Sequence, residues 1–357
     1  MKKSLIALAV LAASGAAMAQ SSVTLYGVAD AGVTYLNGAD NWSGVTSGNN
    51  LTSRLGFRGV EDLGGGLKAN FVLEGGFNLD NGDGASGYAG AKAGEGFQFK
   101  RRSTVGLSGG FGEVRMGREL TAAFNATARY DVFGSVGIGQ SRLWADGGVV
   151  DASANATAVT TNQRISNALT YVSPDFSGFK FGLNYGFGET TASNSDSGYL
   201  GAGLTYDNGP LSLGLGLERL NNGANSVATS DIDAWSLGGS YDFGVAKLLA
   251  GYRESKVDRA TGENKRLGYY VAATAPVGAG TVRVSYNRYE NELANVKGKA
   301  DQFAIGYVYG LSKRTSVYGT YAYIKNKDGA NLYTLGSGGL KTNGSQQGVQ
   351  VGVSHAF

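Results

Sequence analysis

The amino-acid sequence predicts an all-β fold in which sixteen antiparallel strands close into a transmembrane β-barrel. Three observations lead to this prediction. Apolar residues recur at every second position in sixteen stretches, glycine supplies 59 of the 357 residues, and short turns alternate with longer polar connections. A period of two residues is that of a strand with one apolar face, and alternating short and long connections are typical of an up-and-down barrel.

The strands follow from this alternation, taken from the N-terminus onward. In one of them Phe179, Phe181 and Leu183 alternate with Lys180 and Gly182, and no window of the chain shows a competing helical period. In chain order the predicted strands cover residues 22–36, 51–60, 67–79, 97–108, 112–120, 162–173, 179–189, 198–207, 211–221, 232–242, 245–255, 265–275, 281–290, 300–310, 315–325 and 347–357.

The connections between these strands fall into two sets. The short set is rich in turn-forming residues and lies at 61–65, 173–175, 207–210, 242–244, 276–278 and 311–313. The long set is polar and lies at 37–50, 80–96, 188–197, 221–231 and 326–346. Because the two sets alternate, we expect the turns at one end of the barrel and the loops at the other.

The N-terminus has the features of an export signal. Two lysines precede a short apolar stretch, and small residues follow at Ala17 and Ala19. We therefore expect residues 1–19 to be a signal peptide cleaved after Ala19, and residues 20–357 to form one barrel domain outside the inner membrane.

The composition excludes several classes of protein. A mean hydropathy of −0.14 excludes a helical-bundle membrane protein. With 31 basic against 28 acidic residues the charge is too balanced for a nucleic-acid partner. The absence of cysteine and the single histidine argue against an enzyme and against a metal or cofactor site.

Alternation alone does not decide which face of the strands meets water. A secreted sandwich would bury its apolar face, whereas an outer-membrane barrel turns it toward lipid. The glycine-rich second face, the aromatic residues near strand ends and the strand length of about ten residues favour the membrane barrel.

Four segments, 22–30, 53–64, 111–118 and 352–357, together carry a resemblance to a known family. They resemble the trimeric general porins of Gram-negative bacteria, in particular the neisserial and beta-proteobacterial branch. The resemblance implies short periplasmic turns, long extracellular loops and a third loop folded into the pore. It further implies an outer-membrane homotrimer, in contact with lipid and lipopolysaccharide, through which small hydrophilic solutes diffuse passively.

The resemblance also assigns candidate residues to a pore constriction. The long connection at 120–161 corresponds to the inward loop, and its acidic candidate is Asp131, for which a solvated turn carboxylate is the alternative. The opposing basic cluster is expected to comprise Arg54, Arg164 and either Arg101 or Arg102, because family spacing favours the former and strict alternation the latter. The candidates for the constriction are therefore Arg54, Arg101, Arg102, Arg164, Asp131 and Glu74, the last as a partner of the cluster.

Alternation places further charges on the lumen face. The predicted lining residues are Asp30, Arg58, Lys68 and Arg115. Basic residues outnumber acidic ones on this face, so we expect the pore to prefer anions. The alternative on the same fold is a substrate-specific outer-membrane channel or a surface receptor or adhesin.

Two residues are expected to act outside the pore. Arg118 has the outward parity of its strand, and we expect it at the trimer seam or above the membrane. Phe357 ends an outward apolar row, and the resemblance implies that the outer-membrane assembly machinery reads this terminal aromatic residue.

Overall fold

The computed structural model describes residues 22–84, 96–145, 163–188, 198–221, 231–259, 262–293, 296–330, 333–337, 339 and 341–357. Residues 1–19, predicted to be the signal peptide, lie outside them. The strands within these ranges are β1 (Ser22–Asn37), β2 (Asn41–Ser47), β3 (Arg54–Gly64), β4 (Leu67–Gly76), β5 (Arg102–Gly109), β6 (Gly112–Leu120), β7 (Arg164–Val172), β8 (Phe179–Gly186), β9 (Tyr199–Asn208), β10 (Leu211–Leu220), β11 (Ile232–Asp242), β12 (Lys247–Arg259), β13 (Gly262–Val277), β14 (Gly280–Leu293), β15 (Val296–Gly310), β16 (Thr315–Lys327) and β17 (Ser345–Ala356).

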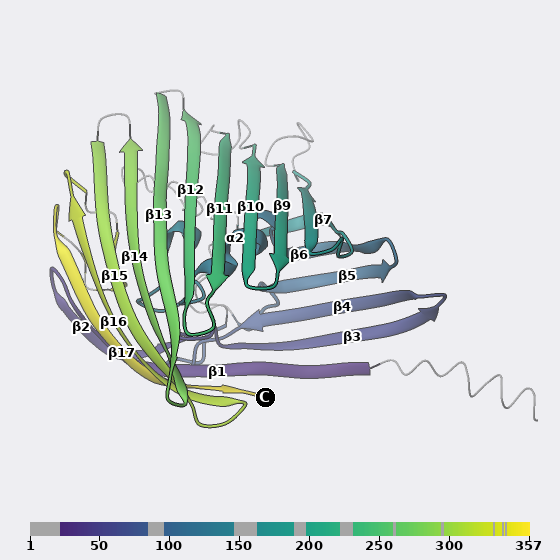
Figure 1. Cartoon of the computed structure of the whole chain (residues 1–357), viewed down its shortest axis with the longest axis horizontal. Helices are drawn as coiled ribbons and strands as arrows, with labels where there is room; N and C mark the ends of the chain where they lie inside the picture. Colours follow the sequence, from purple (N-terminus) through teal and green to yellow (C-terminus); the bar gives the residue numbers. More distant parts are fainter. Residues whose placement is uncertain are drawn as a thin grey trace, which may run out of the picture.

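The strands form one antiparallel sheet that closes on itself. Strand β1 pairs with β17 along one edge and with β3 along the other, and the C-terminus lies beside β1 (Figure 1). Each of the strands β4–β16 pairs with the strands before and after it in the sequence. Strands β1 and β3–β17 therefore make a closed barrel of sixteen strands, which confirms the predicted fold.

Strand β2 was not predicted, because residues 37–50 have the composition of a loop. It folds back on the second half of β1, from Ala31 opposite Ser47 to Asn37 opposite Asn41. Of the residues of β1, only Ser22–Val28 pair with β3. The backbone groups of β1 that β3 leaves unpaired would otherwise lie at an open sheet edge, so β2 completes the ladder there.

The two faces of the barrel wall have opposite polarity. Large apolar side chains such as Leu213 and Leu217 on β10 are exposed on the outside, whereas Ser236 and Gln302 are buried inside. A soluble sandwich has the reverse arrangement, and an apolar outer surface suits lipid.

The tight turns lie within a few residues of their predicted positions, whereas residues 85–95, 189–197 and 222–230 of the predicted long connections lie outside the described residues. Gly209 and Gly278 have positive φ angles of 55° and 58° in tight turns at one end of the barrel. At the other end, β12 and β13 are longer than predicted and are separated by two residues, as are β14 and β15. These two connections are extended hairpins, because the strands continue to pair beyond the expected membrane span.

The long connection after β6 folds along the inner wall. Its described part contains α2 (Ala122–Thr127), the 3-10 turn η1 (Ala128–Tyr130) and α3 (Arg142–Ala145). The Thr121 hydroxyl accepts a hydrogen bond from the Phe124 backbone N–H (3.3 Å) and caps α2. None of the described helices is long and apolar enough to cross a membrane.

Glycines on the inner wall make room for this loop. A Cβ atom at Gly203 would overlap the Ala122 carbonyl, and one at Gly214 would overlap the Ala126 carbonyl. Helix α2 therefore lies directly on the backbone of β8–β11 (Figure 1). The glycines of the lumen face thus allow the loop to pack closely against the wall.

Candidate functional site

A cavity of about 380 Å³ lies inside the barrel between the loop and the opposite wall. The wall contributes Arg54, Arg101 and Arg164, and the loop contributes Gly134–Gly137 and Gln140. The turn before β3 also lines it. Among the lining residues that the structure describes there is no Asp or Glu, so every formal charge among these residues is positive.

A carboxylate behind the cavity orients two of the arginines. Glu74 Oε1 lies 2.5 Å from Arg101 Nε, and Glu74 Oε2 lies 3.6 Å from Arg54 Nε. The Tyr26 hydroxyl donates a further hydrogen bond to Glu74 Oε2 (3.1 Å). Glu74 does not line the cavity itself, and it acts as a bridge that holds two positive groups side by side.

Arg164 joins this group from the first position of β7. Its Nε donates to the Arg101 carbonyl oxygen (3.0 Å). The register between β6 and β7 shifts nearby, and Asn167 has a positive φ of 52° at that point. An asparagine tolerates this conformation, and the bulge bends the strand at the point where it leaves the cavity.

The sequence left open whether Arg101 or Arg102 faces the lumen, and in the structure both side chains turn inward. Arg102 follows the alternation of β5: its Nε donates to Thr104 Oγ1 (3.1 Å), and its Nη2 lies 3.9 Å from Glu119 Oε2. Arg101 precedes the strand, so strand alternation does not constrain it, and it reaches the cavity. The sequence could not give this answer because the strand boundary falls between the two residues.

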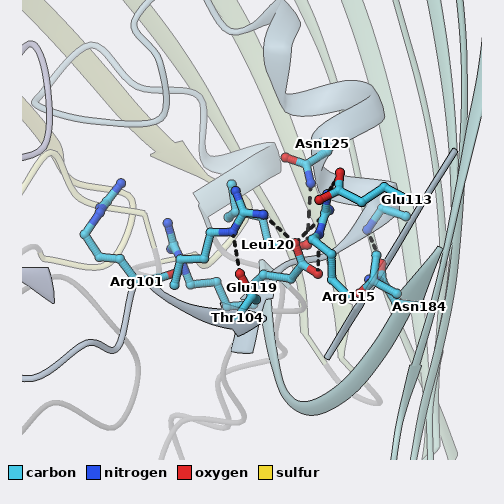
Figure 2. Close-up of polar contacts among 12 residues, drawn as sticks. Arg101, Thr104, Glu113, Arg115, Glu119, Leu120, Asn125 and Asn184 are labelled. Carbon is cyan, nitrogen blue, oxygen red and sulfur yellow. Dashed lines mark hydrogen bonds and ion pairs between the residues drawn. The ribbon is translucent and has the colours of Figure 1, made fainter. Parts of the chain in front are cut away.

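Next to the arginine group, two carboxylates of β6 hold Arg115 (Figure 2). Arg115 Nη1 lies 2.7 Å from Glu113 Oε2, and Arg115 Nη2 lies 2.8 Å from Glu119 Oε2. Glu119 is 4% exposed and was missed among the candidates. The signal was present, since Glu119 shares the lumen parity of Glu113 and Arg115.

Comparison with known proteins places this geometry in a family. A family model described as Gram-negative porin matches residues 5–329. The chain belongs to the Gram-negative porin family. It is 46% identical over all of both chains to outer membrane porin protein 32 of Delftia acidovorans. It is 30% identical to the major outer membrane protein P.IB of Neisseria gonorrhoeae, over 93% of this chain and 96% of that one. The solved anion-selective porin from Comamonas acidovorans is similar with a TM-score of 0.82 and 41% identity, over 95% of this chain and all of that one.

A porin is a passive channel, and the lumen of this porin carries the groups for that task. The cavity presents fixed positive charge and backbone groups to whatever passes. Within the described ranges no group of three or more His, Asp or Glu could hold a metal ion.

The expectation that Asp131 opposes the arginines across the pore is wrong. Its carboxylate is 5% exposed and accepts hydrogen bonds from the backbone N–H groups of Phe133, Ser135 and Ser141 at 2.9–3.0 Å. Burial raises the pKa of the Asp131 carboxyl, and these N–H donors oppose the rise. Asp131 therefore shapes the loop tip and does not line the cavity.

Asp30 has the predicted inward parity, but it does not line the open lumen. It is fully buried, and its carboxylate accepts hydrogen bonds from the Asn49 N–H (2.8 Å), the Leu51 N–H (3.0 Å) and the Tyr318 hydroxyl (2.8 Å). The turn before β3 covers it. Alternation could not show this, because the covering segment is not part of a strand.

Arg58 and Lys68 lie on the lumen face outside the cavity. The Arg58 guanidinium lies over the Tyr26 ring at 5.3 Å from its centroid. Lys68 is exposed near the tight turn between β3 and β4.

Arg118 and Phe357 lie on the outer surface. Arg118 donates to the Lys100 carbonyl (2.7 Å) and to Ser166 Oγ (2.7 Å), so its side chain lies across three neighbouring segments. The Phe357 backbone pairs with Gly27 at 3.1 Å in both directions, and a Cβ atom on Gly27 would overlap the Phe357 ring. The last residue therefore packs where β1 has no side chain.

Arg283 of β14 connects the loop to the opposite turn. Its Nη1 donates to the Val132 carbonyl (3.2 Å) and its Nη2 donates to Asn50 Oδ1 (2.9 Å). Its guanidinium also lies 4.8 Å from the centre of the Phe133 ring. One side chain thus contacts both segments that form the rim of the cavity.

Proposed function

We propose that this porin is an outer-membrane channel that prefers small anions. The observation that carries the proposal is the charge of the cavity, where Arg54, Arg101 and Arg164 face the loop and the described lining holds no carboxylate. A guanidinium stays charged at any physiological pH. In a narrow gap with protein on both sides its field is screened less than in open saline, and fixed Arg charges favour anions. The similarity to the porin named anion-selective supports the same direction.

In this mechanism solutes diffuse without a covalent step or energy input. The positive groups compensate an anion that sheds part of its hydration in the gap, whereas they repel a cation. The expected transverse field between Asp131 and the arginines has no role here, and selectivity comes from the arginine side alone.

The test is the zero-current potential across a planar bilayer in a KCl gradient. The Arg54→Gln/Arg164→Gln variant should shift this potential toward cation preference by tens of per cent of its full range, because two of three cavity charges are lost. Lys297→Gln is the matched control, since Lys297 is 78% exposed on the outward face of β15. An unchanged potential in the double variant would contradict the proposal.

We further propose that the mature chain starts at Gln20 and assembles as a homotrimer. Its outer face would contact lipid and lipopolysaccharide, with Arg118 at the seam and Phe357 read by the assembly machinery. The exposed apolar outer wall supports the lipid contact. N-terminal sequencing of the protein purified from outer membranes tests the cleavage site.

A further inference from the structure

A second, smaller cavity lies inside the barrel at the far end of the inward loop. Its volume is about 30 Å³, and it shares no lining residue with the larger cavity. Three arginines from three elements line it: Arg142 of α3, Arg253 of β12 and Arg266 of β13. Among its described lining residues there is no Asp or Glu.

Two of these arginines use only part of their hydrogen-bonding capacity. Arg142 Nη2 donates to the Thr334 carbonyl (2.6 Å), and Arg253 Nη2 lies 2.7 Å from Glu218 Oε2. In the part of the chain that the structure describes, the Nε and Nη1 groups of both residues have no protein acceptor. A guanidinium carries five N–H donors in a fixed plane, so each retains donors for a further partner.

Part of the charge at this site is buried in protein. The Arg253 side chain is 9% exposed and Glu218, its carboxylate partner, is 1% exposed. Leu143 and the stacked rings of Tyr289 and Tyr333, 4.9 Å apart, also line the cavity. Charges at low local dielectric repel one another strongly, and a bound anion would relieve that repulsion while accepting the remaining N–H bonds.

We propose that this cavity is a second anion-binding site, sized for one small inorganic anion such as a halide. A cavity of this volume holds about one or two water-sized particles, which matches a single small anion. The site lies toward the end of the barrel that carries the long loops, where α3 contacts β13. The cavity would be an intermediate binding site for anions on the path to the arginines of the larger cavity. This role rests on the proposed anion preference, whereas binding itself does not.

The binding test is anomalous diffraction from crystals of the mature porin grown with sodium bromide. We expect a bromide peak between Arg142, Arg253 and Arg266. It should be lost in Arg266→Gln and in the charge-neutral pair Arg253→Gln/Glu218→Gln, which leaves no buried carboxylate unpaired. Single-channel conductance of the same variants should fall roughly two-fold at low KCl and change little at high KCl, where salt screens the site.

The outcomes separate this proposal from the proposed function. No bromide peak overturns the site, even if conductance falls, because long-range repulsion alone would explain the fall. A peak without any change in low-salt conductance indicates an adventitious ion only. It would overturn the role of the cavity as an intermediate binding site for permeating anions. A peak with the expected conductance change in a porin that shows no anion preference would keep the site and reject the proposed selectivity.

Discussion

At the scale of single residues, the Asp131 carboxylate organises backbone instead of facing solute. Its two oxygens accept three N–H groups of the loop tip, whose residues 134–137 line the cavity. A buried N–H left without an acceptor destabilises a fold by about 1–3 kcal/mol. The position of the cavity rim therefore depends on this one side chain.

Asp131→Asn should loosen the loop tip, because one acceptor oxygen becomes an NH₂ group that faces an N–H donor. We expect brief closures and higher open-channel noise in planar bilayers, with a smaller shift in reversal potential than Arg54→Gln/Arg164→Gln gives. Asp80→Asn removes the same charge from an exposed position and serves as control. If Asp131→Asn shifted the potential and left the noise unchanged, Asp131 would act as a pore charge after all.

Alternation predicted which face each strand residue occupies, but it could not predict whether another segment covers the side chain on that face. Asp30 has the inward parity, yet the turn before β3 covers it. Glu74 and Arg101 meet because Arg101 lies just outside β5, where alternation no longer applies. Contacts of this kind depend on loops that pack across the barrel, and no local period in the sequence carries that information.

At the scale of elements, the loop is held by side chains from several strands. Tyr130 bonds to Ser212, Tyr270 bonds to the Val132 N–H, and Gln302 donates to two carbonyls of the loop tip. Arg283 adds the contact to the opposite turn. The loop and the turn form one rim because this network joins them.

Arg283→Lys should widen the rim without changing its charge, since an ammonium group cannot reach Val132 and Asn50 in the geometry of the guanidinium. We expect noisier and slightly larger single-channel currents in Arg283→Lys and Arg283→Gln alike. Arg58→Gln is the control, because Arg58 lies on the lumen face against Tyr26 and outside the lining of the cavity. Quiet currents in Arg283→Lys would show that only the charge of Arg283 matters.

Gly214→Val should press α2 toward the barrel axis. The new side chain would overlap the Ala126 carbonyl, and the strand ladder prevents the wall from moving outward. Overpacking of this kind costs about 1–3 kcal/mol, and we expect lower conductance. Gly319→Val in β16 is the matched control because no atom lies within 4 Å of its Cβ position. Equal conductance in both variants would mean that α2 does not limit the pore.

At the scale of the whole molecule, the closure of the sheet was predictable from the sequence, but the surface that contacts another copy of the chain was not. Sixteen alternating stretches joined by alternating short and long connections predicted a ring without edges, and pairing of β1 with β17 and β3 closes it. Backbone groups in lipid require such closure. The outer face of one chain, in contrast, does not reveal which part meets another copy.

The proposed seam at Arg118 gives the test for the assembly. Arg118 lies outward and ties β6 to the segments of Lys100 and Ser166. A charge on the outer face is sheltered at a protein contact but unfavourable against lipid.

We expect the wild-type porin to migrate as a trimer in detergent until it is boiled. Arg118→Gln should lower the temperature at which the trimers dissociate, while the reversal potential stays unchanged. Lys297→Gln, on the outward face of β15, should not affect dissociation. A monomer at all concentrations would reject the trimer, whereas a trimer with unaltered dissociation in Arg118→Gln would confine Arg118 to contacts within its own chain.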